Sequence, residues 1–268
     1  MAQFAFRNPA FSQSGAVAQP ISTEQPTSAQ LDEIYQRAST PAEGDVMTVE
    51  DTLAKTVGAF ALLLVGAAVG WFLGPAMPLL WIGAAIVGLV LGLVNSFKRE
   101  PSAPLILIYS VVEGVFVGGI SRFYEDAFAG VVVQAVIASL VVVGVTLALF
   151  ASGKIRASAR ATKIFLIAMI GYALFSLINF GLVVFGVNDD PYGLRGSVTI
   201  AGIPLGIVLG VFVVLLAAYS LVLDFDYVQR GVNNRAPRRY GWTGAFGIVT
   251  TVVWLYLEIL RMFALARR

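Results

Sequence analysis

The sequence predicts an all-α polytopic membrane protein, a bundle of seven transmembrane helices. Of its 268 residues, 58% are hydrophobic and only 13% are charged, whereas a soluble domain carries about a quarter charged residues. Residues 56–97, 127–153 and 196–223 contain no charged side chain, and each stretch exceeds the roughly 20 residues that cross a bilayer. Such long continuous apolar runs indicate helices and not the alternating strands of a membrane β-barrel.

Seven apolar spans are expected within a transmembrane domain, residues 47–268. The first begins after Thr48, a residue type that caps helices, followed by acids in the first turn. The connections are too short to hold a soluble domain, and the last is expected to run from residue 226 to 242. The expected spans are 53–74, 78–97, 104–123, 127–150, 163–186, 201–224 and 243–264.

Residues 1–46 are rich in Ser, Gln, Pro and Ala. This composition predicts a disordered cytosolic N-terminal tail, because it offers little apolar surface to bury. A tail that binds a partner protein is the alternative.

The distribution of Lys and Arg predicts the orientation. Most of these residues lie on the N-terminal side of the expected membrane, and between spans on the other side lie only Arg122 and Arg195. We therefore expect a multi-pass protein of the plasma membrane with a cytosolic N-terminus. Seven spans then place the C-terminus outside, while Arg267 and Arg268 argue against that side, so the exit of the last span stays open.

Glycines recur four residues apart in several spans. This spacing lets helix backbones approach closely in lipid, and it favours packing within the bundle over a phosphate-binding loop. The pairs are Gly66/Gly70, Gly88/Gly92 and Gly114/Gly118, with a triple at Gly202/Gly206/Gly210.

The chain contains no histidine and no cysteine, which excludes histidine-based triads, disulfides and zinc sites built on these residues. The GxGD and GxSG patterns of intramembrane proteases are also absent. We expect no enzyme activity, no cofactor and no nucleic-acid partner. A pH response near neutrality would have to come from carboxylates.

Four acids lie in or at the edge of the expected spans, namely Glu113, Asp224, Asp226 and Glu258. Acidic side chains are costly in lipid and mark functional sites or buried pairs. Their carboxylate oxygens are the hard ligands that Ca²⁺ prefers, and Asp224 and Asp226 are the candidate calcium ligands.

Helical geometry separates the two aspartates. Residues two apart point about 200° apart on a helix, so Asp224 and Asp226 cannot share a face. Asp224 shares its face with Gly210, Ala217 and Ser220, a stripe of small residues expected to pack inside the bundle. Periodicity therefore favours Asp224 as the inward acid.

Each aspartate also has a purely structural interpretation. Asp226 fits a solvated helix end. Asp224 fits an ion pair with Lys98 or Arg99, which are expected at the same membrane face.

The seventh span carries a second candidate group. Glu258 and Arg261 are three residues apart and can pair on one helix. Thr251 lies seven residues before Glu258 and shares its face. A structural ion pair and a role in permeation both remain open for Glu258.

Three motifs carry a family resemblance over roughly residues 48 to 265. VVEGVFVGGIS in the third span, LVLDFD closing the sixth and WLYLEILR in the seventh resemble the Bax inhibitor-1 (transmembrane Bax inhibitor motif, YccA-like) family. The nearest likeness is to its bacterial branch with a longer polar N-terminal tail. The resemblance implies a pH-sensitive calcium leak, gated by two aspartates in the sixth and seventh helices that share a proton.

The match to the aspartate pair is incomplete. The resemblance favours Asp226 as the first aspartate, against the periodicity argument for Asp224. The position of the second, 25 residues later, holds Thr251. Glu258, on the same face, or Glu113 would have to supply the second carboxylate.

Two functions are consistent with these observations. One is a calcium or other cation leak channel, pH-sensitive and gated by intramembrane carboxylates, with the lipid bilayer, Ca²⁺ and H⁺ as its partners. The other is a non-conducting membrane regulator that binds other membrane proteins and uses its acids as packing ion pairs. A monomer is favoured in either case.

Overall fold

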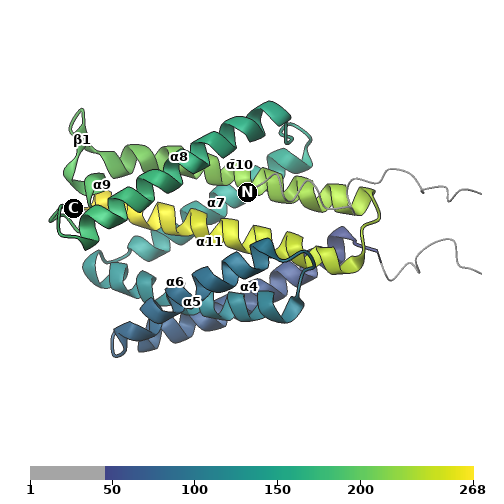
Figure 1. The fold of residues 1–268 in the computed structure, drawn as a ribbon, viewed down its shortest axis with the longest axis horizontal. Coiled ribbons are helices and arrows are strands. Elements are labelled where there is room, and N and C mark those ends of the chain that lie inside the picture. The colour runs from purple at the N-terminus through teal and green to yellow at the C-terminus, as the bar shows by residue number, and fades with distance from the viewer. Residues whose placement is uncertain (1–45) are drawn as a thin grey trace, which may run out of the picture.

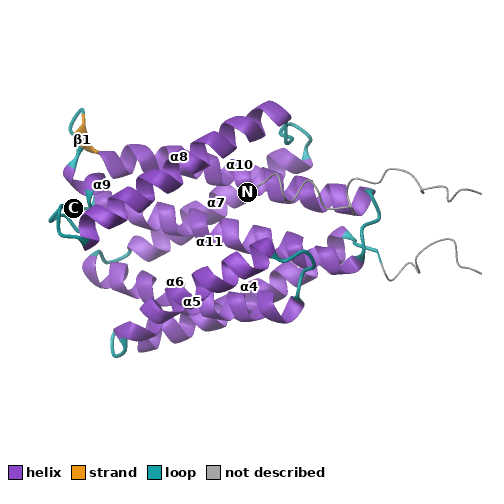
Figure 2. Ribbon diagram, in the orientation of Figure 1, coloured by secondary structure: helices purple, strands orange, loops and turns teal. Residues whose placement is uncertain are grey.

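The computed structural model describes residues 46–268 (Figures 1 and 2). The expected disordered tail, residues 1–46, lies outside the described residues except for Val46. Within the described range, seven long helices are apolar enough to cross a membrane: α4 (Val49–Leu73), α5 (Pro78–Phe97), α6 (Ala103–Ala127), α7 (Val131–Ala151), α8 (Ala159–Val184), α10 (Leu205–Asn233) and α11 (Gly241–Ala266). The predicted all-α, seven-span bundle is confirmed, and the chain is a membrane protein.

The connection between α8 and α10 contains the other regular elements of this region. The short helix α9 (Leu194–Ser197) precedes a hairpin of β1 (Thr199–Ile200) and β2 (Ile203–Pro204). The two strands are antiparallel, with Thr199 opposite Pro204, and the hairpin is orange in Figure 2. A 3₁₀ turn, Arg238–Tyr240, precedes α11.

Helix α11 forms the centre of the bundle. It runs between α8 and α10 on one side and α4, α5 and α6 on the other (Figure 1), and it packs against α4, α6, α7 and α10. Its Leu255 and Leu260 are fully buried in the core. By contrast, α8 buries only Phe165 and Asn179, so it lies at the outside of the bundle and exposes apolar side chains to lipid.

Helices α4 and α6 are in backbone contact. A Cβ added to Gly66 would lie 2.2 Å from the carbonyl oxygen of Val111, and one added to Gly114 would lie 2.1 Å from that of Leu63. The spaced glycines of each helix therefore face the backbone of the other, as small residues do in membrane helix pairs.

Helix α10 is longer than the sequence predicts. The sixth span was expected to end at residue 224, but the helix continues to Asn233. It ends before Arg235, whose positive φ of 51° leaves the helical region. Asp224 and Asp226 therefore lie inside the helix, about two turns or more before its end, and not at a solvated terminus.

The seven helices place Val46 and Arg268 at opposite ends of the bundle, the purple and yellow ends in Figure 1. We call these the N-terminal end and the C-terminal end. The N-terminal end holds the α5–α6, α7–α8 and α10–α11 connections, and the C-terminal end holds the others, including α9.

Candidate functional site

The carboxylate of Asp224 lies between α10 and α11. Its Oδ2 accepts a hydrogen bond of 2.7 Å from Thr251 Oγ1. Ser220 Oγ lies 3.3 Å from the same threonine oxygen. Gly247 leaves the space for the carboxylate, because a Cβ there would lie 2.6 Å from Asp224 Oδ1. Three oxygen-bearing side chains thus meet between α10 and α11.

The small residues of α10 turn Asp224 toward α11. Ala217, on the same face, is fully buried. A Cβ added to Gly210 would lie 3.0 Å from the side chain of Met262 in α11. The stripe that contains Asp224 is therefore the face that packs on the central helix.

Asp226 is placed differently. Its Oδ2 lies 2.8 Å from Arg230 Nη2, one turn further along the same helix, so its charge is paired within α10. The resemblance favoured Asp226 as the partner of the position that Thr251 occupies, but the hydroxyl of Thr251 contacts Asp224 instead.

The ion pair suggested for Asp224 does not form within the described part of the chain. Lys98 and Arg99 lie after the end of α5 and are exposed. Neither makes an ion pair with Asp224 among residues 46–268, so the carboxylate has a hydroxyl partner there and no counter-ion.

A second polar cluster surrounds Glu258 near the C-terminal end. Glu258 is only 4% exposed, and its carboxylate accepts a hydrogen bond from Tyr172 and pairs with Arg261, as their spacing predicts. Arg195 Nη1 lies 3.7 Å from Glu258 Oε2. Two arginines therefore face one carboxylate.

Arg195 was not among the candidate residues. The whole residue is 3% exposed. Its Nη2 donates hydrogen bonds to Ser176 Oγ at 2.8 Å and Tyr172 Oη at 3.1 Å. In the sequence it is one of two basic residues in the connections at this end, and no pattern distinguishes it from Arg122. Its burial depends on the path of the α8–α10 connection.

Glu113 belongs to a different helix pair. It faces α5, where a Cβ added to Gly88 would lie 2.6 Å from Glu113 Oε2. Asp224 instead contacts α11, and Glu258 contacts α8 and α9. The described residues contain no group of three or more His, Cys, Asp or Glu side chains that could hold a metal ion.

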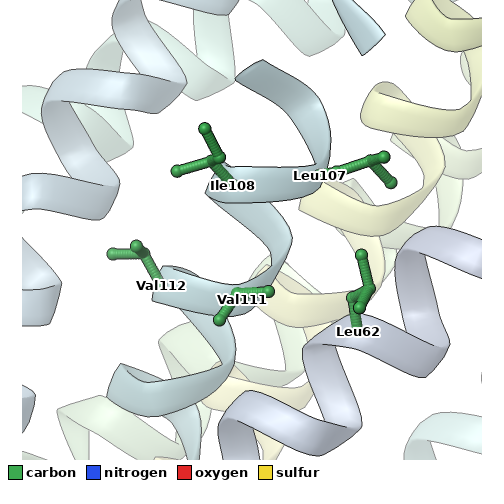
Figure 3. A pocket seen from close by; sticks show the side chains of 5 residues that line it. All are labelled: Leu62, Leu107, Ile108, Val111 and Val112. Atoms are coloured by element: carbon green, nitrogen blue, oxygen red, sulfur yellow. The ribbon is translucent and has the colours of Figure 1, made fainter. Parts of the chain in front are cut away.

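A hollow of about 320 Å³ lies between α4 and α6. Figure 3 shows the five side chains that line it, all of them aliphatic: Leu62, Leu107, Ile108, Val111 and Val112. Because it offers no polar atom to an ion, it does not form part of a cation route.

The α10–α11 connection is fastened to the start of α4 at the N-terminal end. Met47 N donates a hydrogen bond of 2.7 Å to Ala236 O. Asp51 accepts hydrogen bonds of 2.9 and 2.6 Å from Arg238, and Lys55 donates to Arg238 O at 2.7 Å. These contacts fix the entry of the central helix next to the first one.

Comparison with known proteins identifies one family. A family model described as Bax inhibitor 1 like matches residues 8–268. No curated protein matches the chain. The family match includes every residue that the structure describes.

Proposed function

The chain belongs to the Bax inhibitor 1 like family, and from that premise we propose that it is a cation leak of the plasma membrane, with Ca²⁺ as its cargo and Asp224 as its gate. Protonation of the Asp224 carboxylate switches the charge of the site and makes the leak sensitive to pH. We also propose that the chain belongs to the bacterial branch of the family and that residue 46 faces the cytosol.

The proposal is carried by the Asp224 carboxylate, which faces the central helix without a counter-ion among the described residues. An acid at this depth in a membrane bundle marks an ion pathway or a buried pair. The pair is not formed. Carboxylate and hydroxyl oxygens are ligands for Ca²⁺, and Thr251 and Ser220 add hydroxyls beside the acid.

Glu258 is a weaker candidate for the gate. Arg261 and Arg195 already face its carboxylate, and a cation would have to displace them. Because the described acids do not gather in one place, the geometry favours a passing ion over a tightly held one. Channels need sites that bind weakly enough to release.

The test is calcium flux into proteoliposomes that contain the purified full chain, measured as a function of external pH. We expect flux in the wild type that changes with pH, and loss of the pH response in Asp224→Asn. Asp226→Asn is the matched control, because that acid lies two residues away and is paired with Arg230.

A folded wild type that passes no calcium at any pH contradicts the proposal. The non-conducting membrane regulator then becomes the better explanation. Loss of the pH response in Asp226→Asn, with Asp224→Asn unaffected, contradicts the assignment of the gate.

A further inference from the structure

We infer that Arg195 is the barrier that closes the C-terminal end of the bundle to cations. The inference rests on the proposed function, which supplies the cation route that the barrier closes. It adds a residue from a connecting segment to a pathway otherwise built from spanning helices.

Arg195 lies between spanning helices. Its guanidinium bonds to Tyr172 and Ser176 of α8 and faces Glu258 of α11. Its Cβ would lie 3.0 Å from a Cβ added to Gly206 of α10. Arg195 therefore fills the space where three spanning helices meet, and glycine at position 206 makes that close approach feasible.

Arg195 also lies on the C-terminal side of the Asp224–Thr251 pair. Glu258 lies seven residues beyond Thr251 on the same face of α11, which is about 10 Å at 1.5 Å per residue. Glu258 and Arg195 thus lie between the Asp224–Thr251 pair and the C-terminal end. A cation that leaves Asp224 along this face of α11 toward that end meets Arg195 before it meets solution.

The cluster around Arg195 contains more positive than negative charge. Arg195 and Arg261 together face the single carboxylate of Glu258, which leaves one excess positive charge in the bundle interior. Arginines placed in this way exclude cations from membrane pores. One charge at about 10 Å changes the energy of a passing cation by roughly 1–2 kcal/mol at an effective dielectric constant of 20.

Arg195 belongs to a connecting segment and not to a spanning helix. Arg195 lies in α9, a helix of four residues. The side chain of Asn179 holds this segment on α8 by donating to Tyr192 O at 3.1 Å and accepting from Leu194 N at 2.7 Å. Arg195 Nη1 and Glu258 Oε2 have no hydrogen-bond partner among the described residues, so their ion pair is the loosest contact of the cluster.

Thiol labelling from each side of the membrane tests the barrier. The chain has no cysteine, so Ser220→Cys introduces a single thiol beside Thr251. The probe is a membrane-impermeant cationic thiosulfonate reagent, applied to vesicles of defined orientation. We expect slow labelling from the C-terminal side when Arg195 is present, and about tenfold faster labelling in Arg195→Gln, the factor given by one charge at this distance.

Two control variants and one substitute variant complete the experiment. Arg195→Lys keeps the charge, and we expect slow labelling. Arg267→Gln removes a charge at the same end, where Arg267 bonds the backbone carbonyls of Phe128 and Ala129, and we expect no change. Arg261→Gln removes the same unit of charge from the cluster and replaces Arg195→Gln if that variant does not fold.

Equal labelling rates from the C-terminal side with and without Arg195 overturn the inference, as does a Lys variant that labels as fast as the Gln variant. Labelling does not require calcium to pass. If calcium flux is normal but labelling is no faster in Arg195→Gln, the barrier alone is overturned. Absent calcium flux with the expected labelling pattern overturns the proposed cargo and supports the barrier.

Discussion

The hydroxyl of Thr251 in the central helix donates a hydrogen bond of 2.7 Å to the carboxylate of Asp224 in α10. This contact joins two residues that are far apart in the sequence and fixes the register of the two helices at that level. Gly247, one turn before Thr251, provides the room for the acid. The site is therefore shaped by α11 as much as by the acid itself.

Replacing Thr251 by Val is expected to weaken calcium flux. Val has nearly the shape of Thr but lacks the hydroxyl, so the Asp224 carboxylate loses the bond that orients it. A hydrogen bond to a charged group contributes about 1.5–3 kcal/mol, and we expect the calcium concentration for half-maximal flux to rise about tenfold or more. Thr251→Ser keeps the hydroxyl and serves as the control; equal values for the Val and Ser variants contradict the role of the bond.

Gly114→Ala is expected to destabilise the bundle. The added Cβ would lie 2.1 Å from the backbone oxygen of Leu63, so α4 and α6 must separate, and overpacking of this kind costs about 1–3 kcal/mol. Thermal unfolding in detergent should show a lower midpoint. Gly58→Ala is the control in α4, because nothing lies within 4 Å of a Cβ there, and its midpoint should stay unchanged or rise.

The helices and the α4–α6 contact could be predicted from the sequence because both are local patterns. Charge-free runs of lipid length identify spans, and glycines four residues apart identify a close helix face. The inward direction of Asp224 follows from the same periodicity, since its stripe of small residues packs on α11.

Other features of the site depend on contacts between distant segments. The polar last turns of α10 gave no apolar signal beyond residue 224, although the helix runs to Asn233. In the sequence, Arg195 looks like an ordinary charged residue of a loop. Its contact with Glu258 forms only in the folded structure. The packing of α10 on α11 makes Asp224 the partner of Thr251. The residue spacing of the family pattern had favoured Asp226 as that partner.

Glu258→Gln is expected to destabilise the protein strongly. It leaves Arg195 and Arg261 facing each other without the carboxylate, and removal of one partner from a buried ion pair costs about 3–5 kcal/mol. Glu100→Gln is the control, because Glu100 pairs with Arg239 at an exposed site, where such pairs contribute at most about 1 kcal/mol. The measurement is the unfolding midpoint in detergent.

A double variant, Glu258→Gln with Arg261→Gln, sharpens this prediction. It removes one charge of each sign, so we expect it to be more stable than Glu258→Gln alone. If the double variant loses as much unfolding free energy as the two single variants together, the two residues do not interact as the structure indicates.

A reporter fused after Arg268 is expected to lie outside the cell, on the side opposite residue 46. Arg267 and Arg268 would argue against this orientation if their charges were free. In the structure, Arg268 Nη1 lies 2.7 Å from Asp190 Oδ2, and Arg267 donates a 2.5 Å hydrogen bond to Ala129 O. Both arginines are thus engaged with connections at the C-terminal end, and Asp190 offsets one of their charges.

Alkaline phosphatase fused after Arg268 should be active, and a cytosolic fluorescent reporter fused there should be dark. Fusions in the α10–α11 connection should give the opposite result. A cytosolic reporter that is bright both after Arg268 and in the α10–α11 connection would mean that the central helix does not cross the membrane, and the route proposed along its face would fail with it.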